Sequence, residues 1–322
     1  MAHKTKRVPS AQSLKLKSCY TLTMRSIQCS IVAGTLSGDP REAPQLSREM
    51  GFAGMQFDAY GPSLRVPDLS GTGRREFRQL LSGQNQQLVG LRVDLGSKGF
   101  GPGADVDRLL HGLDRALEAA VGLIAPLVCI DLGSIPEPER TATPAPKITP
   151  KQAGLILLPE SFAVPAIDPV TANPPPDAAF VSQVEAALGE LGELADRYSV
   201  VLAFRTDLSS FAAIDRTLRS VRCPWFGVDF DPAAALRDEW SMDEIFSRLG
   251  SDIRHVRGRD AIGGVNHRTK PAIVGRGDIQ WDQLLANLDA AGYAGWITLD
   301  PVELPDRLVA AAQGLKHVRA IA

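Results

Sequence analysis

Short apolar runs alternate with amphipathic segments along most of the chain, and this alternation limits the folds that it can adopt. The alternation predicts a parallel sheet with helices packed against it, because each strand must be followed by a crossover segment before the next strand. We predict eight strands, at Ile27–Ala33, Gly54–Asp58, Leu88–Leu95, Leu127–Leu132, Val200–Phe204, Trp225–Phe230, Ile253–Val256 and Trp296–Leu299.

The segments between these runs have the marks of helices. Leu109, Leu113 and Leu117 repeat at intervals of four, which places them on one helical face. Ser241 followed by Glu244 three residues later is the pattern of a capping box. Helices are predicted at 40–50, 74–81, 106–120, 177–197, 211–221, 242–249, 281–291 and 307–321.

Eight successive β/α units predict a single α/β domain, a closed (β/α)8 barrel over residues 27–322. The competing fold is a doubly wound open sheet. That fold would favour a Gly-x-Gly-x-x-Gly motif opening a helix after the first strand, and the chain has none. A length of 322 residues with 44% hydrophobic and 22% charged residues fits one large globular domain.

Two segments break the regular pattern. Residues 1–26 are basic and contain no Asp or Glu, so we expect a disordered tail, and Met24 is a plausible true start. Residues 134–176 hold 11 of the 23 prolines, which fix φ and remove backbone donors. This predicts an irregular insertion after the fourth strand. A lid over the barrel mouth is the alternative that stays open.

Charge and hydropathy argue against several classes of partner. A net charge of −2 gives no reason to expect binding to nucleic acid, apart from the alternative that the basic tail binds a polyanion. No apolar run reaches the 18 residues of a membrane span, and no signal-peptide core is present, so we expect a cytoplasmic protein. The cysteines Cys19, Cys29, Cys129 and Cys223 form no Cys-x-x-Cys pair, which favours reduced thiols over disulfides or zinc.

Charged residues close four predicted strands in the C-terminal half: Arg205, Asp231, Arg257 and Asp300. The strand ends at one mouth of a (β/α)8 barrel are where binding and catalytic groups gather. Two interpretations stay open for this balanced set. The four can form two internal Arg–Asp pairs that hold the mouth together. They can instead form a cationic pocket for a carboxylate or phosphate, with the aspartates binding sugar hydroxyls.

Several sequence phrases resemble the xylose isomerase-like barrels, the group of sugar phosphate isomerases and epimerases. The phrases are Ile253–Asp260 (IRHVRGRD), Val274–Trp281 (VGRGDIQW), Gly292–Asp300 (GYAGWITLD) and, more loosely, Gly51–Phe57 (GFAGMQF). The resemblance implies a (β/α)8 barrel and sugar isomerase or epimerase chemistry.

The resemblance also implies a divalent cation, held by Glu, Asp, His and Glu from strands five to eight. Those positions carry Arg205, Asp231, Arg257 and Asp300 here, and Gln56 replaces a second-strand glutamate. A guanidinium offers no lone pair to a metal. At ~4 Å and an effective dielectric near 20, a divalent ion and a unit charge interact by roughly 8 kcal/mol. Two arginines therefore offset two aspartates, and we expect a degenerate metal site with no metal or other cofactor.

The resemblance and the residues together suggest roles. Asp300 or His255 would be the catalytic base, with Arg205 and Arg257 stabilising a developing enediolate. His255 has an ordinary pKa suited to neutral pH, although a packed strand residue is the alternative. Asp260, just past the seventh strand, is a candidate substrate ligand or half of a structural salt bridge.

Weaker candidates lie at other strand ends. Asp58 and Asp131 end the second and fourth strands and could face the pocket or cap the following helices. Arg92 and Lys98 lie around the glycine-rich segment Gly96–Gly103, which could bind an anion, although its glycines lack the spacing of a P-loop.

The functional prediction is a sugar phosphate isomerase- or epimerase-like protein that acts on, or binds, a small anionic sugar derivative without a metal. The alternative is a non-catalytic relative that binds a sugar-like ligand or a protein partner. The sequence leaves open whether the chain is an enzyme and whether it forms a homo-oligomer.

Overall fold

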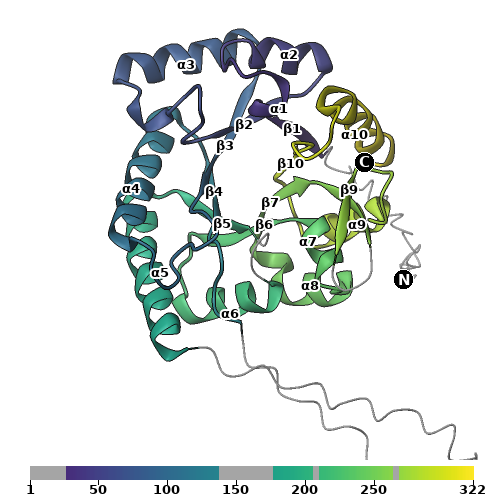
Figure 1. The fold of residues 1–322 in the computed structure, drawn as a ribbon. Coiled ribbons are helices and arrows are strands. Elements are labelled where there is room, and N and C mark those ends of the chain that lie inside the picture. Colours follow the sequence, from purple (N-terminus) through teal and green to yellow (C-terminus); the bar gives the residue numbers. More distant parts are fainter. Residues whose placement is uncertain (1–26, 138–176, 206–209, 264–267) are drawn as a thin grey trace, which may run out of the picture.

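The computed structural model describes residues 27–137, 177–205, 210–263 and 268–322. Its centre is a closed barrel of eight parallel strands in the order β1-β10-β7-β6-β5-β4-β3-β2 (Figure 1). The strands are β1 (Gln28–Val32), β2 (Gly54–Asp58), β3 (Gln87–Asp94), β4 (Leu127–Asp131), β5 (Val201–Arg205), β6 (Phe226–Phe230), β7 (Ile253–Gly258) and β10 (Trp296–Leu299). Each strand pairs with its neighbours in parallel, which confirms the predicted (β/α)8 barrel.

Helices form an outer ring around the strands (Figure 1). Side-chain caps begin several of them: Ser70, Asp177 and Ser241 each accept a hydrogen bond from a backbone N–H of the first turn. The helices are α1 (Ala33–Leu36), α2 (Ala43–Met50), α3 (Gly71–Gly83), α4 (Val106–Leu123), α5 (Ala178–Tyr198), α6 (Phe211–Val221), α7 (Pro232–Arg237), α8 (Met242–Leu249), α9 (Trp281–Ala290) and α10 (Arg307–Ile321).

The apolar core lies between the barrel and this ring. Strand residues such as Ile31, Ile130 and Phe204 are fully buried there against the helices. Leu127, Cys129 and Ala203 form a separate small apolar cluster. Other buried strand side chains, among them Ser30, His255 and Thr298, are polar. The candidate site is built on these polar side chains inside the barrel.

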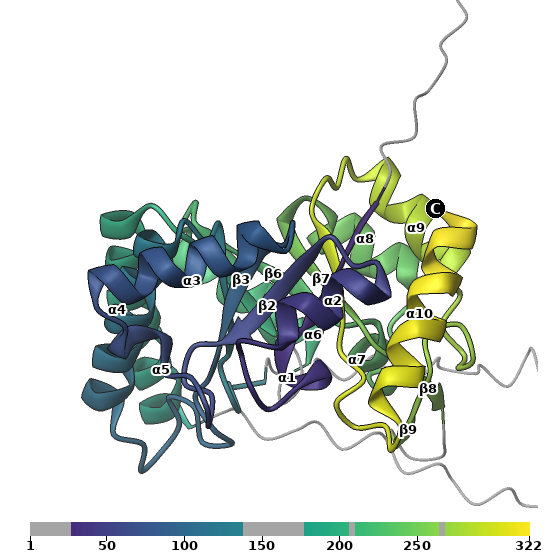
Figure 2. The same ribbon diagram turned by 90° about the horizontal axis from the view of Figure 1, so that it is seen from above.

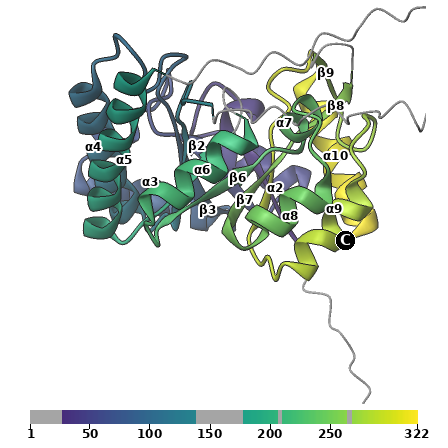
Figure 3. The ribbon, with the colours of Figure 1, turned by 90° about the horizontal axis from the view of Figure 1, so that it is seen from below.

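Several short elements were not predicted from the sequence, among them the helix α1. A two-stranded hairpin of β8 (Asp260–Gly263) and β9 (Thr269–Ala272) follows β7, and the short helix α7 packs beside it on the same side of the barrel (Figures 2 and 3). Both are short, and the hairpin strands lack an apolar alternation, so the sequence carried little signal for them.

The predicted basic tail at 1–26, the start at Met24 and nearly all of the predicted insertion lie outside the described residues; of the insertion only 134–137 is described. The lid therefore stays a prediction. Within the described part of the chain, no helix has the length and apolar character to cross a membrane. Cys29 and Cys129 are buried free thiols, and Cys223 is a partly exposed one.

Candidate functional site

Strand register places polar side chains side by side inside the barrel. Paired positions in parallel strands point to the same face, so a polar residue opposite another polar residue meets it directly. Four such pairs are bonded through their side chains: Asp58 with Arg92 at 2.6 Å, Asp131 with Arg205 at 3.4 Å, Asp229 with His255 at 2.6 Å and Ser30 with Thr298 at 2.6 Å.

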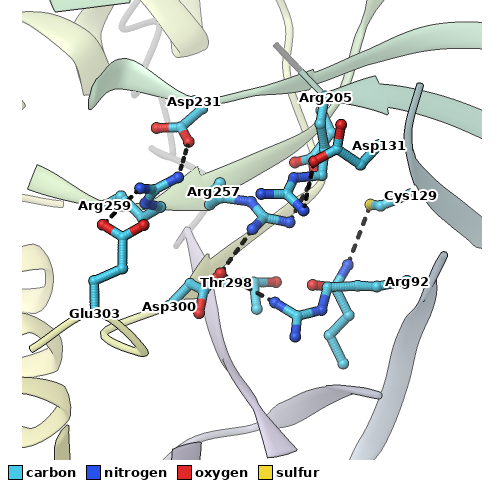
Figure 4. Close-up of polar contacts among 12 residues, drawn as sticks. Arg92, Cys129, Asp131, Arg205, Asp231, Arg257, Arg259, Thr298, Asp300 and Glu303 are labelled. Atoms are coloured by element: carbon cyan, nitrogen blue, oxygen red, sulfur yellow. Dashed lines mark hydrogen bonds and ion pairs between the residues drawn. The ribbon is translucent and has the colours of Figure 1, made fainter. Parts of the chain in front are cut away.

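Arg257 lies at the centre of the mouth (Figure 4). Its side chain is 2% exposed; Nη1 donates to Asp300 Oδ2 at 2.7 Å and Nη2 donates to Asp229 Oδ2 at 3.3 Å. Burial alone would lower the pKa of Arg257, but the carboxylates of Asp229 and Asp300 outweigh burial and raise it. The guanidinium is therefore a fixed positive charge between two carboxylates.

Asp300 accepts hydrogen bonds from two arginines. Its Oδ2 lies 2.7 Å from Arg257 Nη1 and 3.0 Å from Arg92 Nη1. Burial would raise the pKa of Asp300, but these guanidiniums, with smaller contributions from Arg259 and Arg205, lower it. Oδ1 is buried and has no hydrogen-bond partner among the described residues. Asp300 is thus an ionised carboxylate with one unused acceptor oxygen.

The other members of the predicted set pair with residues outside it. Arg205 lies 3.4 Å from Asp131, and burial together with the nearby Arg257 lowers its pKa. Asp231 Oδ2 accepts from Arg259 Nη1 at 2.8 Å, while its Oδ1 accepts from the N–H of Ala233 and so begins α7. Of the expected internal Arg–Asp pairs, the one described is Arg257 with Asp300.

A cavity of about 380 Å³, which we call the mouth cavity, opens at this end of the barrel. Of the six predicted site residues, Arg205, Arg257 and Asp300 line it. Its charged lining consists of four arginines and four carboxylates: Arg92, Arg205, Arg257, Arg259, Asp58, Asp94, Asp300 and Glu303. This density of fixed charge in one cavity suits a polar, charged ligand.

His255 lies beneath the mouth and is fully buried. Its Nδ1 is 2.6 Å from Asp229 Oδ1, and its Nε2 is 2.6 Å from Thr298 Oγ1, which in turn meets Ser30 Oγ at 2.6 Å. Burial would raise the pKa of Asp229, but His255 and Arg257 together outweigh burial and lower it. Both ring nitrogens are engaged, so in this arrangement His255 can influence the mouth cavity only through its neighbours.

Asp260 organises a loop. Its two carboxylate oxygens accept from the backbone N–H groups of Ala261, Gly275, Gly277 and Ile279 and from Trp281 Nε1. The side chain is 2% exposed. These contacts give Asp260 a structural role between β7 and α9, and its role in substrate binding stays a prediction.

The comparisons with known proteins agree on the scaffold. A model of the family described as xylose isomerase-like TIM barrel matches residues 44–321. The chain belongs to the xylose isomerase-like TIM barrel family. A search of curated proteins found no significant match.

Solved members of this fold superpose over most of the chain. One is a xylose isomerase domain protein from Planctomyces limnophilus, with TM-score 0.66 and 14% identity over 92% of this chain and 95% of that one. Another is D-psicose 3-epimerase from Clostridium cellulolyticum H10, with TM-score 0.65 and 14% identity over 92% and 99%. A third is 3-keto-D-glucoside 4-epimerase from E. coli, with TM-score 0.63 and 16% identity over 91% and 99%. At these identities the likeness concerns the fold alone.

The donor set at this xylose isomerase-like mouth does not fit the divalent cation that the resemblance implies. Arg257 and Arg205 have no lone pair to offer, and the Arg257 guanidinium already bridges the carboxylates of Asp229 and Asp300. Asp231 is engaged by Arg259 and by the start of α7. The positions that correspond to the family's ligands therefore offer a cation two guanidiniums and two carboxylates that are already bonded to arginines.

One other cluster has metal-binding residue types. Cys129, Asp229 and His255 place possible ligand atoms within 4.8 Å of one another in the buried interior. Burial raises the pKa of Cys129 well above its usual value, which favours the protonated thiol. Gln56 Nε2 lies 3.1 Å from this thiol, and His255 and Asp229 bond each other, so the cluster is already held by internal hydrogen bonds.

Sequence reasoning missed several residues of this barrel mouth. Asp229 and Thr298 were not singled out, although each lies two residues before a predicted site residue. Because strand side chains alternate between faces, Asp229 shares a face with Asp231, and Thr298 shares one with Asp300. That two-residue period was the signal available for finding them.

Proposed function

We propose that the mouth cavity binds a small anionic sugar derivative without a divalent metal, and that the protein isomerises or epimerises it. The observation that carries this proposal is the pairing of Asp300 with Arg257 and Arg92 beside a cavity lined by four arginines. Membership of a family whose solved neighbours include sugar epimerases supports the choice of a sugar ligand.

The arginines would stabilise negative charge on the ligand, the role that the resemblance assigns to a divalent cation. A guanidinium presents several N–H donors in a planar fork that matches a carboxylate, a phosphate or an enediolate. Arg205 and Arg257 line one cavity, so they would stabilise the same developing negative charge. Arg257 stays protonated because the carboxylates of Asp229 and Asp300 outweigh burial and raise its pKa.

Asp300 would act as the base. It is ionised, it lines the mouth cavity, and its Oδ1 has no hydrogen-bond partner among the described residues. The carboxylate would take a proton from the carbon next to the carbonyl of the sugar, leaving an enediolate held by the arginines. Return of the proton from Asp300 to the neighbouring carbon, with the hydroxyl proton passing from one enediolate oxygen to the other, completes an isomerisation; an epimerisation requires a second proton donor, such as water, on the opposite face.

A non-catalytic, sugar-binding relative is the second candidate, and one observation favours it. The arginines around Asp300 lower its pKa, and a carboxylate with a lowered pKa is a weak base. The same ion pairs that organise the cavity would then reduce its power to remove a carbon-bound proton.

Ligand-dependent thermal shift tests binding. Protein stripped with EDTA would be heated with aldonic acids, sugar phosphates and the matching neutral sugars. We expect stabilisation by the anionic sugars only, because a ligand that binds the native state alone raises its stability. Arg205→Gln should lose the shift, whereas Arg48→Gln, an exposed change on α2, should keep it. Equal shifts with neutral sugars, or none with any sugar, would refute the proposal.

Proton exchange separates the two candidates. Each stabilising sugar would be incubated with the protein in D2O and followed by 1H NMR. Loss of a carbon-bound proton signal, abolished in Asp300→Asn, would identify an enzyme. Stabilisation without exchange would identify a binding protein.

A further inference from the structure

A larger cavity adjoins the mouth cavity. It encloses about 720 Å³ and lies between the loop after β2, the glycine-rich loop after β3 and the first turns of α4. We call it the side cavity. Six polar side chains that line it are Tyr60, Arg65, Lys98, Arg108, His111 and Arg115.

The two cavities share a wall. Tyr60, Val93 and Asp94 line both of them. The hydroxyl of Tyr60 donates to the carbonyl oxygen of Gly112 on α4 at 2.5 Å, which fixes the ring in position. The two cavities are therefore neighbours, with Tyr60 in the wall between them.

The positive charge of the side cavity is concentrated on two residues. Arg65 and Arg115 both pair with Asp68, at 2.9 and 2.5 Å. Lys98 and Arg108 are exposed, and no ion pair within 4.0 Å is described for either. They are the cations of this cavity with charge available for a ligand.

The carboxylates of the side cavity are engaged with the backbone. Asp94 Oδ1 accepts from the N–H of Gly96 at 2.7 Å, and Asp105 Oδ1 accepts from the N–H of Arg108 at 3.2 Å. They shape the loop and the start of α4. When Asp68, the shared partner of Arg65 and Arg115, is counted with Asp94 and Asp105, four cationic side chains face three carboxylates, a local excess of one positive charge.

The loop that carries Lys98 is firmly held. Gly99 has φ +48°, and a Cβ there would overlap the carbonyl oxygen of Leu132. Phe100 is fully buried, and Gln183 Nε2 donates to the carbonyl oxygens of Phe100 and Gly101 at 2.7 and 3.0 Å. The backbone at Lys98 is thereby fixed, so a ligand would not have to order this loop on binding.

A third cavity also adjoins the mouth cavity. It encloses about 130 Å³ and shares Asp58, Gly61 and Pro62 with the mouth cavity, but no cationic side chain lines it. An anionic group is therefore favoured in the side cavity and disfavoured in the third.

We propose that the side cavity binds a phosphoryl group, with Lys98 and Arg108 as charged donors and His111 as a further donor. Two separate cations match a dianion with three acceptor oxygens better than they match a carboxylate. The remainder of a phosphorylated sugar would then lie in the mouth cavity. Placing the sugar portion in the mouth cavity rests on the proposed function, whereas phosphoryl binding in the side cavity does not.

Isothermal titration with inorganic phosphate at low ionic strength tests the site directly. We expect the double variant Lys98→Gln/Arg108→Gln to weaken binding by about tenfold or more, because it removes two charge-assisted contacts. The matched control Arg48→Gln/Lys316→Gln removes the same charge from exposed positions on α2 and α10 and should leave affinity unchanged. Equal affinity of wild type and the first double variant, or no binding by wild type, would overturn the proposal.

Ribose 5-phosphate and ribose distinguish a sugar phosphate from free phosphate. A ligand that spans both cavities should bind more tightly than phosphate and should be weakened both by Lys98→Gln/Arg108→Gln and by Arg205→Gln. If only Arg205→Gln weakens it, the phosphoryl group lies in the mouth cavity, which overturns this assignment and leaves the proposed function intact. A third outcome is that only Lys98→Gln/Arg108→Gln weakens ribose 5-phosphate binding and that ribose 5-phosphate binds no more tightly than inorganic phosphate. The side cavity is then a phosphate site, and the proposed function loses support.

Discussion

The guanidinium of Arg257 and the carboxylate of Asp300 are joined inside the barrel, with Nη1 2.7 Å from Oδ2 and both side chains 2% exposed. The resemblance to the xylose isomerase-like barrels implies metal ligands at these two positions, and Arg257 led us to expect a degenerate metal site instead. The chain neutralises its buried carboxylates with a side chain of its own. The chemistry at the mouth must therefore be considered without assuming a cation.

Metal binding is the first prediction. Calorimetric titration of EDTA-treated protein with Mn²⁺, Co²⁺ and Mg²⁺ should show no micromolar binding at the mouth. Each unit charge ~4 Å away contributes roughly 8 kcal/mol at a dielectric near 20, so two arginines offset the attraction of two aspartates and nothing remains to offset dehydration of the ion. Micromolar binding that Asp231→Asn abolishes would contradict this. The reverse variant, Arg205→Glu/Arg257→His, restores the donor types of the family and should gain affinity for Mn²⁺, provided that circular dichroism shows it folded.

Removing Arg257 should destabilise the fold severely. Arg257→Met leaves the buried carboxylates of Asp229 and Asp300 without their shared cation, and breaking a buried ion pair in this way costs about 3–5 kcal/mol. Denaturant unfolding measures the loss. Arg197→Ala removes an exposed arginine 3.7 Å from Asp114 and should change stability little. Equal losses of unfolding free energy in the two variants would show that the buried contacts of Arg257 stabilise the fold no more than an exposed ion pair does.

Acid should weaken the fold through the same carboxylates. The pKa of Asp300 is lowered from 3.8 in the folded state, so its contribution to stability is complete above the unfolded value and is lost as the pH falls through the folded value. We expect the free energy of unfolding to decrease below about pH 4. Asp300→Asn, which cannot titrate, should show a shallower decrease over the same range, and an unchanged slope would exclude this origin.

Asp260 should matter for stability more than for binding. Asp260→Ala leaves several buried backbone N–H groups and Trp281 Nε1 without an acceptor, and each unsatisfied group costs about 1–3 kcal/mol. Denaturant unfolding should show a large loss of stability. Ligand affinity, measured at a temperature where the variant is still folded, should change little. A stable variant with lost affinity would contradict this and would support the predicted role of Asp260 in substrate binding.

The scaffold was largely predictable from the sequence. Buried parallel strands need continuous apolar runs, and the eight runs of the chain became the eight strands of the barrel. The short hairpin β8–β9 and the helix α7 were missed because neither has the length or apolar periodicity that such reasoning detects.

The site was predictable only in part. Arg205, Arg257 and Asp300 were expected at one mouth, and they line one cavity. Pairing of Arg257 with Asp300 agrees with one of the two interpretations that the sequence left open, but the partners of Arg205 and Asp231 were not expected. Arg205 pairs with Asp131 on the neighbouring strand, and Asp231 pairs with Arg259. Both contacts depend on how the strands are staggered, which residue types alone do not reveal.

The order of apolar and amphipathic segments by itself determined that this chain forms a barrel, and the charges at strand ends determined that the barrel mouth is ionic. Only the tertiary structure decided which charges meet. Arg92 and Asp300 are separated by 208 residues along the chain and meet because the closed sheet brings β3 and β10 around one mouth. The physical reason is that hydrophobic burial is encoded locally by residue type and spacing, whereas an ion pair requires a distance that only the closed, staggered barrel sets.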